Sequence, residues 1–535
     1  MRLLSGLEWI AGALITAAAL AVHVARLRSA GPLWRDEIAV LNLATIDWPE
    51  VVRWFPHEGF PLLFLLLLRG YAAALGTGDA ALRLFGFDVG VLLLGAIWFQ
   101  ALATQRRVPL IALALLGFHP VLFLWGDSVR GYGIGAALIL ITFALLARSL
   151  VRPGQAVLRA ALVSAVLSVQ LLLANAFLLL ALVCSAVVAH LRPRRTGRVR
   201  PALAIGIAAA LSLLPYAAAY RKGREWDAVF RIELSFPWLW GRLGRALGDP
   251  DSPVVWVWLL LFAASAVGVA WLLDRRSTRE LQETRLAVFA FSTCVLAPIF
   301  QLLFLKTLGY LTEDWYYLTL IAVVGVALDT TVGVLAAKRR SIAVLRLAAA
   351  VAVSAALAVP AFDRARERLT SVDLVAAELA RRAAANDFIV VAPWDLGISF
   401  RRYDRGGTAW ATSPPISDLR FHRYDLLKEQ MARTDPQGPL LRKISSTLKS
   451  GRRVWIVGGL AYPPPGTVPP THAPAPRDAA GWRETAWMTA WSLELGSFVQ
   501  RHAVRADRVR LAMPTPVNGI ENAQLIEVEG WREQE

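Results

Sequence analysis

Two adjacent carboxylates, Asp36 and Glu37, stand just beyond the first long apolar segment of the chain, in the sequence Trp34-Arg35-Asp36-Glu37. A carboxylate is costly to keep partly dehydrated at a membrane surface, so the pair indicates a functional site. The chemistry open to such a group is general base catalysis, in which it takes the proton of a hydroxyl group and makes the oxygen a nucleophile. The pair is also compatible with the first turn of a surface helix, where acidic residues are favoured.

Three further clusters combine charged and aromatic residues at the ends of apolar segments, at 57–61, 127–132 and 306–317. Polar side chains there can hydrogen-bond a substrate. Aromatic rings can stack on it or anchor the chain at the boundary between lipid and water. The candidate substrate-binding residues of these clusters are His57, Glu58, Asp127, Tyr132, Glu313, Asp314, Tyr316 and Tyr317.

Cationic side chains near the same boundary are candidates for binding a phosphate group. Arginine can hold phosphate oxygens through two parallel hydrogen bonds, and lysine acts as a point charge. The candidates are Arg130, Lys306 and Arg83. Arg130 and Tyr132 are also compatible with an interfacial anchor. We interpret His57 as a structural residue and not a metal ligand, because no second histidine lies at the spacing typical of metal ligands.

Composition places these clusters in a membrane protein. Of the 535 residues 56% are hydrophobic and only 18% are charged, and the mean hydropathy is +0.48. A membrane-spanning helix needs about 20 mainly apolar residues. We predict about eleven such helices, at 7–27, 80–104, 108–126, 131–149, 156–173, 175–191, 200–220, 254–273, 285–305, 315–336 and 342–360.

Basic residues predict which loops face the cytoplasm, since positive charge concentrates there. They occupy every second connection, at 106–107, 148–152, 192–200, 275–279 and 338–340. These loops share one side with the N-terminus if the apolar stretch 59–76 does not cross, which is the arrangement we prefer. The net charge of +17 is then a signal of topology, and no basic and aromatic stripe indicates a nucleic acid partner.

The composition after residue 361 is that of a soluble α/β domain, and the predicted topology places this domain on the outer side of the membrane.

Cys184 and Cys294 both fall inside predicted spans, so the exported regions contain no disulfide. No GxGxxG or P-loop pattern is present, and we assign no nucleotide site. The predicted elements are helices at 363–384, 440–450 and 485–504, and strands at 388–393, 454–458, 507–512 and 523–528.

The order and sidedness of these motifs resemble the GT-C membrane glycosyltransferases. The branch that they most resemble contains the protein O-mannosyltransferases and the bacterial aminoarabinose transferase of lipid A. The motifs are the acidic pair after Trp34-Arg35, the segment from His57 to Pro61, Ala81-Leu-Arg-Leu84, Asp127-Ser-x-x-Arg130-x-Tyr132, Trp315-Tyr-Tyr317 and the C-terminal α/β domain.

The resemblance implies a polyprenyl-phosphate sugar donor used at the outer face, with an acidic residue of the first outer loop as base. Carried over, this makes Asp36 the base and gives Glu37 a supporting role. The sequence departs from the family in two places. The usual His-Pro-Pro is replaced by the segment 57–61, and the late Arg-Tyr pair appears as Trp315-Tyr316 without arginine.

We therefore predict a polytopic α-helical membrane protein of the bacterial inner membrane. Its transmembrane catalytic domain spans 1–360 with an outer loop at 28–79, and its exported periplasmic domain spans 361–535. The expected activity is inverting transfer of a sugar to a hydroxyl of an envelope glycan, lipid or protein. A divalent metal held by Asp36, Glu37 and Asp127 is left open. The alternatives are an O-antigen polymerase or ligase, and a transporter or lipid flippase, which is expected to carry charged or broken helices near the midplane.

Overall fold

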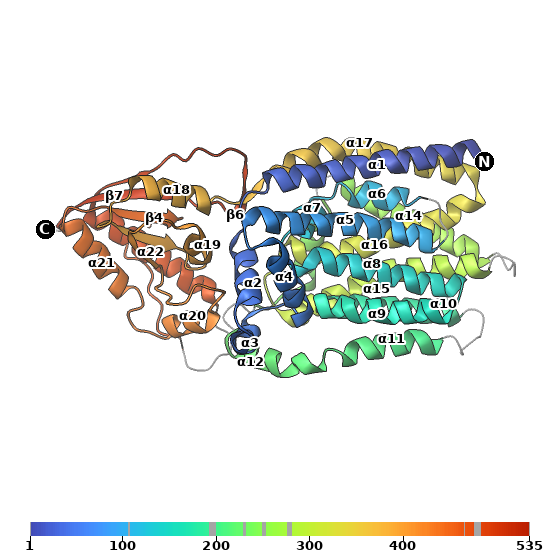
Figure 1. Ribbon diagram of the computed structural model, residues 1–535, viewed down its shortest axis with the longest axis horizontal. Coiled ribbons are helices and arrows are strands. Elements are labelled where there is room, and N and C mark those ends of the chain that lie inside the picture. The colour runs from blue at the N-terminus through green and yellow to red at the C-terminus, as the bar shows by residue number, and fades with distance from the viewer. Residues whose placement is uncertain are drawn as a thin grey trace. The chain divides into compact units, whose positions relative to one another are not determined.

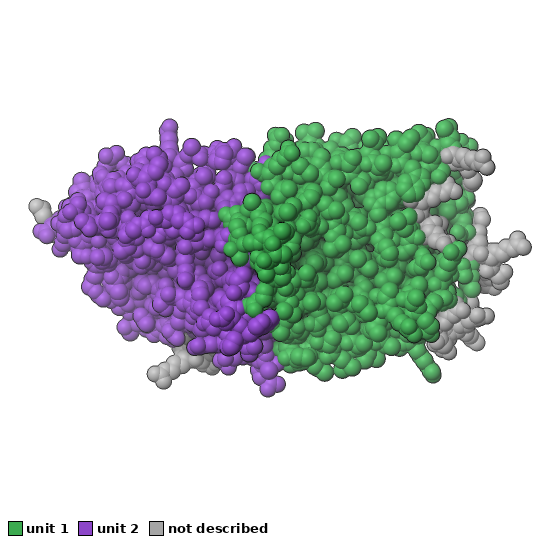
Figure 2. Space-filling model, in the orientation of Figure 1, with its two compact units in different colours: residues 1–28, 60–217, 233–366 green, residues 29–59, 218–232, 367–535 purple. Residues whose placement is uncertain are grey.

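A computed structural model describes residues 2–104, 108–191, 199–227, 232–248, 253–274, 281–464, 466–475 and 483–533 (Figure 1). The predicted cytoplasmic loops at 106–107 and 275–279, and most of the loop at 192–200, lie outside these ranges. The chain forms two compact units (Figure 2). Unit 1 contains residues 1–28, 60–217 and 233–366, and unit 2 contains residues 29–59, 218–232 and 367–535.

Unit 1 is a bundle of apolar helices, in which α10 packs on α15 and α8 packs on α5 and α9. The apolar composition favours helices because a helix satisfies its own backbone hydrogen bonds in lipid. The helices are α1 (Arg2–Ser29), α4 (Leu62–Leu75), α5 (Asp79–Ala103), α6 (Leu110–Leu116), α7 (Pro120–Gly126), α8 (Gly131–Val151), α9 (Gln155–Leu171), α10 (Asn175–Leu191), α11 (Val199–Leu211), α13 (Phe236–Gly248), α14 (Pro253–Asp274), α15 (Leu281–Leu308), α16 (Leu318–Lys338) and α17 (Arg340–Ala365).

Among the described residues, eight helices are long and apolar enough to cross a membrane, and each coincides with one of the predicted spans. Their burial differs. In α16, 89% of the most apolar window is buried inside the chain, against 17% in α14. Helix α16 is therefore central to the bundle, whereas α14 leaves most of its apolar surface for lipid.

The three remaining predicted spans correspond to shorter helices. Helices α9 and α10 are 17 residues long, and the span 108–126 is divided into α6 and α7. The division falls before Pro120, which has no N–H to donate and disfavours a helical residue before it. Helix α4, in the stretch 59–76, has 14 residues, or about 21 Å, and is shorter than a hydrocarbon core of about 30 Å.

Unit 2 contains a five-stranded sheet with the order β3-β2-β4-β7-β5, together with a parallel pair of β1 and β6. Strands β3, β2 and β4 are parallel, and β7 is antiparallel to both β4 and β5. The elements are α2 (Arg35–Thr45), α3 (Trp48–Trp54), α12 (Ala217–Asp227), β1 (Arg368–Thr370), α18 (Val372–Arg382), β2 (Phe388–Ala392), α19 (Leu396–Tyr403), β3 (Ala409–Thr412), α20 (Tyr424–Met431), α21 (Gly438–Lys449), β4 (Val454–Gly458), α22 (Glu484–His502), β5 (Ala503–Arg508), β6 (Val517–Glu521) and β7 (Leu525–Trp531).

Strand β2 is buried on both faces, which is why its sequence is continuously apolar. Ile389 and Val391 pack in one core cluster with residues of α18 and α19. Phe388 and Val390 pack in a second cluster with residues of α21 and α22. Gly458 ends β4 with a φ of +105°, and a Cβ there would lie 1.7 Å from the carbonyl oxygen of Ala392. Only glycine permits this close approach of β4 to β2.

The predicted class, a polytopic α-helical membrane protein with a C-terminal α/β region, is confirmed, and the sheet is partly parallel as expected. Some bounds were wrong. The predicted helix 363–384 is divided between the end of α17, strand β1 and α18, because the chain crosses from the bundle to a sheet at this point. The predicted strand 507–512 is β5 displaced toward the N-terminus, since α22 ends at His502.

Candidate functional site

Helix α2 of unit 2 begins directly at the acidic pair. Its first turn is capped by Glu37, whose carboxylate accepts a hydrogen bond of 3.2 Å from the backbone N–H of Trp34. Glu37 is fully buried, as are Ile38 and Leu41 on the same helix. The Glu37 carboxylate therefore stabilises the start of α2, which is half of the reciprocal cap typical of a helix N-terminus.

Asp36, the neighbouring carboxylate, remains accessible, with a side chain that is 19% exposed. Its Oδ1 lies 3.5 Å from Nε2 of His422 and 3.9 Å from Nε of Arg35. The His422 ring stacks on Tyr424 at 5.9 Å, which fixes the orientation of the imidazole. These contacts orient the carboxylate, and its 19% exposed side chain leaves it accessible from solvent.

Arg35 links α2 to two acidic residues elsewhere in unit 2. Its Nε lies 3.2 Å from Asp395 and its Nη1 lies 3.8 Å from Glu521. Glu521 also accepts a hydrogen bond of 2.9 Å from Ser399. Burial lowers the pKa of Arg35, but the nearby Asp395, Glu521 and Asp36 outweigh it and the net shift is upward. Arg35 therefore stays charged and fixes the start of α2 against the α/β core.

Two glutamates, the buried Glu521 and the half-buried Glu484, give this region carboxyl groups that titrate near neutral pH. Burial raises the pKa of Glu521 to about 7. Burial, with the adjacent charge of Asp395, raises the pKa of Glu484 to about 8. Both groups are therefore partly protonated under physiological conditions.

The segment 29–59 is held to the segment 418–426 at several points within unit 2. Asn42 donates a hydrogen bond of 2.6 Å to the carbonyl of Arg420, whose guanidinium lies 3.4 Å from Glu50. His57 stacks on Trp226 at 4.2 Å, and its Nε2 lies 3.9 Å from Asp425.

Burial lowers the pKa of His57 to about 4, so its imidazole is neutral at physiological pH. Glu58, beside it, accepts a hydrogen bond of 2.9 Å from the N–H of Gly59. These contacts favour a structural role for both side chains.

In unit 1 the second and third polar clusters converge on a row of aromatic rings. The Arg130 guanidinium lies 4.5 Å above the ring of Phe60, and Tyr132 meets the same ring edge-on at 5.3 Å. Tyr132 also lies 6.4 Å from Tyr316. The pair Trp125 and Trp315 continues the row at 4.6 Å. Residues of α7 and α8, together with residues just before α4 and α16, thus form one aromatic surface with a cation beside it.

The other candidates in unit 1 have partners of their own. Asp127 is buried and lies 2.7 Å from Nδ1 of His23. Arg242 holds Glu313 at 2.8 Å and Asp314 at 3.9 Å. The remaining contacts are Lys306 above the Phe236 ring at 4.4 Å, Tyr317 hydrogen-bonded to Thr312 at 2.9 Å, and Arg83 buried on α5.

Comparisons with known proteins give a match in structure alone. No family model matches the chain, and no curated protein matches it. ArnT from Cupriavidus metallidurans in the apo state aligns with a TM-score of 0.52 at 15% identity, covering 84% of this chain and 92% of that chain. The apo oligosaccharyltransferase of Archaeoglobus fulgidus aligns with a TM-score of 0.50 at 11% identity, covering 84% and 69%. This chain has a GT-C fold. ArnT bound to undecaprenyl phosphate gives a TM-score of 0.48 at 14% identity, over 84% and 92%.

The sequence did not predict all of the residues that lie around Asp36 and Arg35 in this fold. His422, Asp395 and Glu521 were not predicted, and neither were the elements between 394 and 438. The available signal was the run from Asp418 to Asp425, which is as rich in charged and aromatic residues as the predicted clusters. Among the described residues no group of three or more His, Cys, Asp and Glu is placed to hold a metal ion.

Proposed function

We propose that this protein is a glycosyltransferase that moves a sugar from a polyprenyl-phosphate donor to an acceptor hydroxyl. We place the reaction at the outer face of a bacterial inner membrane, with a glycan, lipid or protein of the envelope as acceptor. The observation that carries the proposal is the accessible Asp36 carboxylate, held at the start of α2 between Arg35 and His422. The GT-C fold supports it, since ArnT and an oligosaccharyltransferase share that fold and ArnT has been crystallised with undecaprenyl phosphate.

In the proposed reaction Asp36 takes the proton of the acceptor hydroxyl. The hydroxyl oxygen forms a bond to the anomeric carbon while the bond from that carbon to the phosphate oxygen breaks on the opposite face. The electron pair of that bond leaves with the polyprenyl phosphate, and the configuration at carbon inverts. His422, at 3.5 Å, orients the Asp36 carboxylate. A positioned base of this kind typically contributes ~10²–10⁴-fold to the rate.

The leaving phosphate requires a cation, and Arg130 is the residue we assign to it, with Lys306 and Arg83 as further candidates. A guanidinium can bind phosphate oxygens bidentately, and this contact strengthens as charge develops on the leaving group. Tyr132 and Tyr316 are the proposed sugar or prenyl contacts. The remaining predicted substrate ligands have structural partners, and we assign them no step.

A transfer assay tests the proposal. The full chain in nanodiscs is supplied with undecaprenyl-phosphate sugars and with envelope material from a deletion strain, and release of undecaprenyl phosphate is measured. We expect release by wild type and by Asp507→Asn, which changes an exposed carboxylate on β5, but not by Asp36→Asn. Donor that crosses the bilayer without cleavage would instead identify a flippase. Cleavage independent of Asp36 would overturn the assigned base.

Reporter fusions test the proposed sidedness. We expect reporters placed beside Asp36, Arg130 and Glu313, and within 361–535, to be exported. Reporters placed in the basic loop at 338–340 are expected to remain in the cytoplasm. A cytoplasmic position of the C-terminal region would contradict the proposal that the reaction takes place at the outer face of the membrane.

A further inference from the structure

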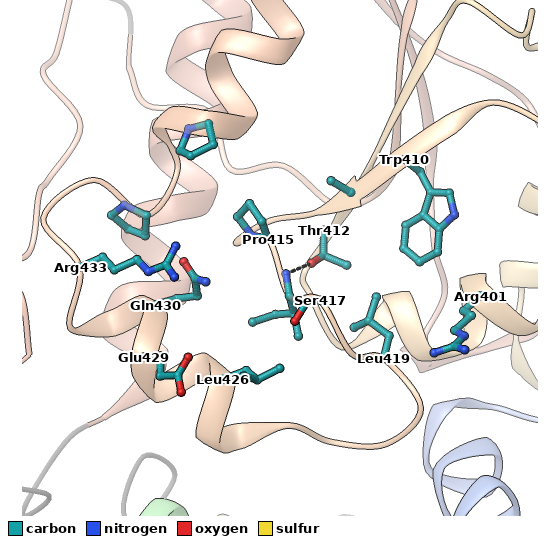
Figure 3. A pocket seen from close by; sticks show the side chains of 14 residues that line it. Arg401, Trp410, Thr412, Pro415, Ser417, Leu419, Leu426, Glu429, Gln430 and Arg433 are labelled. Carbon is teal, nitrogen blue, oxygen red and sulfur yellow. Dashed lines mark hydrogen bonds between the residues drawn. The ribbon is translucent and has the colours of Figure 1, made fainter.

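A cavity of about 710 Å³ opens in unit 2 beside the edge strand β3 (Figure 3). Its residues all lie between 401 and 439. Figure 3 shows Glu429, Gln430 and Arg433 on one side and Trp410 with Arg401 on the other. A volume of this size is in the range that encloses a small organic ligand.

The base of the cavity is rigid because it belongs to a core cluster of the domain. Ile416 and Leu419 line the cavity and are also members of the buried cluster that contains Trp394 and Met431. The loop above them is fixed by Thr412, whose hydroxyl accepts a hydrogen bond of 2.9 Å from the N–H of Ile416 and donates one of 2.6 Å to the carbonyl of Pro414. The cavity is therefore formed before any ligand arrives, which reduces the entropic cost of binding.

One polar group in the wall has an unmet hydrogen-bonding capacity. Gln430 on α20 is only 8% exposed, and its Oε1 atom is buried without a hydrogen-bond partner among the described residues. A buried acceptor of this kind is rarely left unsatisfied in a folded protein. Because Gln430 lines the cavity, rotation of its amide group would present this oxygen to a ligand that donates a hydroxyl or N–H group.

The other walls define which ligand fits. Trp410 is half-buried, with its ring held edge-on against Phe400 at 5.1 Å, and offers an apolar surface. Opposite it stand three planar polar groups: the Gln430 amide, the Glu429 carboxylate and the Arg433 guanidinium. A pyranose ring has an apolar C–H face and a rim of hydroxyl groups, so it matches both walls at once. A hydrocarbon chain would leave the polar wall unsatisfied.

We infer that this cavity is a saccharide-binding site of the C-terminal domain, and that it holds the sugar portion of the acceptor. The assignment of the saccharide to the acceptor rests on the proposed glycosyl transfer. The segment between β3 and α20 contains both Leu419, which lines the cavity, and His422, which contacts Asp36. One short stretch of chain thereby serves both sites.

Binding of free saccharides tests the inference without any transfer reaction. The full chain in nanodiscs is screened by saturation-transfer NMR against mannotriose, galactotriose, trigalacturonic acid and an acetylated glucosamine trimer. We expect at least one to bind, and Gln430→Leu and Trp410→Ala each to weaken it roughly tenfold, equivalent to about 1.4 kcal/mol. Trp531→Ala is the matched control, because that half-buried ring packs on a different core cluster of the same unit. It should leave binding unchanged. Gln430→Leu preserves the shape of the side chain and remains informative if Trp410→Ala does not fold.

The outcomes separate this inference from the proposed function. Failure of all four saccharides to bind, or equal binding by wild type and Gln430→Leu, would overturn the saccharide site. Binding of a peptide library along β3 in place of the saccharides would overturn it as well. Saccharide binding by a protein that cleaves no polyprenyl-phosphate donor would support the cavity as a saccharide site while removing the proposed transfer reaction.

Discussion

Asp36 in unit 2 and Asp127 in unit 1 were nominated by the same argument, and the structure gives them different surroundings. Asp127 is 5% exposed and lies 2.7 Å from the imidazole of His23. Asp36 has a 19% exposed side chain and neighbours at 3.5 and 3.9 Å. A buried carboxylate with a short bond is engaged in structure, whereas an accessible carboxylate can exchange a proton with a substrate hydroxyl. Sequence position alone did not distinguish them.

The largest expected effect concerns the proposed base. Asp36→Asn keeps the shape of the side chain but removes the proton acceptor, so transfer should fall by ~10²–10⁴-fold while donor binding persists. Asp127→Asn should change the rate per folded molecule by less than about threefold, well below that range. Single-turnover kinetics with a lipid-linked donor measure both. If the two variants lose activity equally, the distinction between the two carboxylates is wrong.

The next largest effect is a loss of stability when the contact between Asp127 and His23 in unit 1 is removed. Asp127→Ala leaves His23 without its buried partner, and the free energy of unfolding should fall by roughly 3–5 kcal/mol. Chemical unfolding in detergent measures the loss. The variant with both Asp127→Ala and His23→Ala should lose less than the sum of the two single variants, because the two side chains contact each other. Additive losses would mean that the contact between the two side chains contributes nothing to the free energy of unfolding.

A pH dependence of stability is expected from the acidic region around Arg35. Burial raises the pKa of Glu521 to about 7, from 4.5 in the unfolded chain. Folded protein therefore retains a proton that the unfolded chain releases, and this group makes stability fall as pH rises from 4.5 to about 7. Glu521→Gln removes that contribution. Its stability should match wild type near pH 5 and exceed it near pH 8 by roughly 1–3 kcal/mol. Thermal unfolding at the two pH values measures the difference, and a constant difference would contradict the shift.

The smallest expected effect separates the two members of the acidic pair. Glu37→Ala removes the carboxylate that caps α2 and should lower stability by about 1 kcal/mol. The rate of the chemical step should change little. Glu37→Gln keeps an acceptor for the Trp34 N–H and serves as the control. A rate loss in Glu37→Gln comparable to that of Asp36→Asn would give Glu37 a role in the reaction.

Continuous apolar runs in the sequence correctly predicted the buried strands and the long helices. The strands 388–392 and 454–458 are continuous apolar runs, and the long helices of unit 1 are continuous apolar segments, so each is specified by its own residues. The bounds near 363–371 and 507–512 were wrong, because neighbouring elements compete there for the same residues.

The surroundings of Asp36 could not be predicted in the same way. His422 approaches Asp36, and Asp395 and Glu521 approach Arg35, only through the tertiary fold, which no spacing in the sequence indicates. The short helices α19 and α20 have eight residues each, too few for a clear periodic pattern. The residues of the inferred saccharide cavity lie in the same poorly patterned region.

Unit 2 is built from three separate stretches of chain, and this has a consequence for how the protein is made. The stretch 29–59 leaves the ribosome early, but 307 residues, 60–366, separate it from the third and longest stretch of the unit, which begins at residue 367. At roughly 5–20 residues per second, that interval lasts roughly 15–60 s. During it α19, on which α2 packs, has not been made, and the charges of Asp395 and Glu521 that hold Arg35 do not yet exist. A chain interrupted before Glu521 therefore carries the candidate base but never completes the ion pairs around Arg35, so only full-length protein has a finished site.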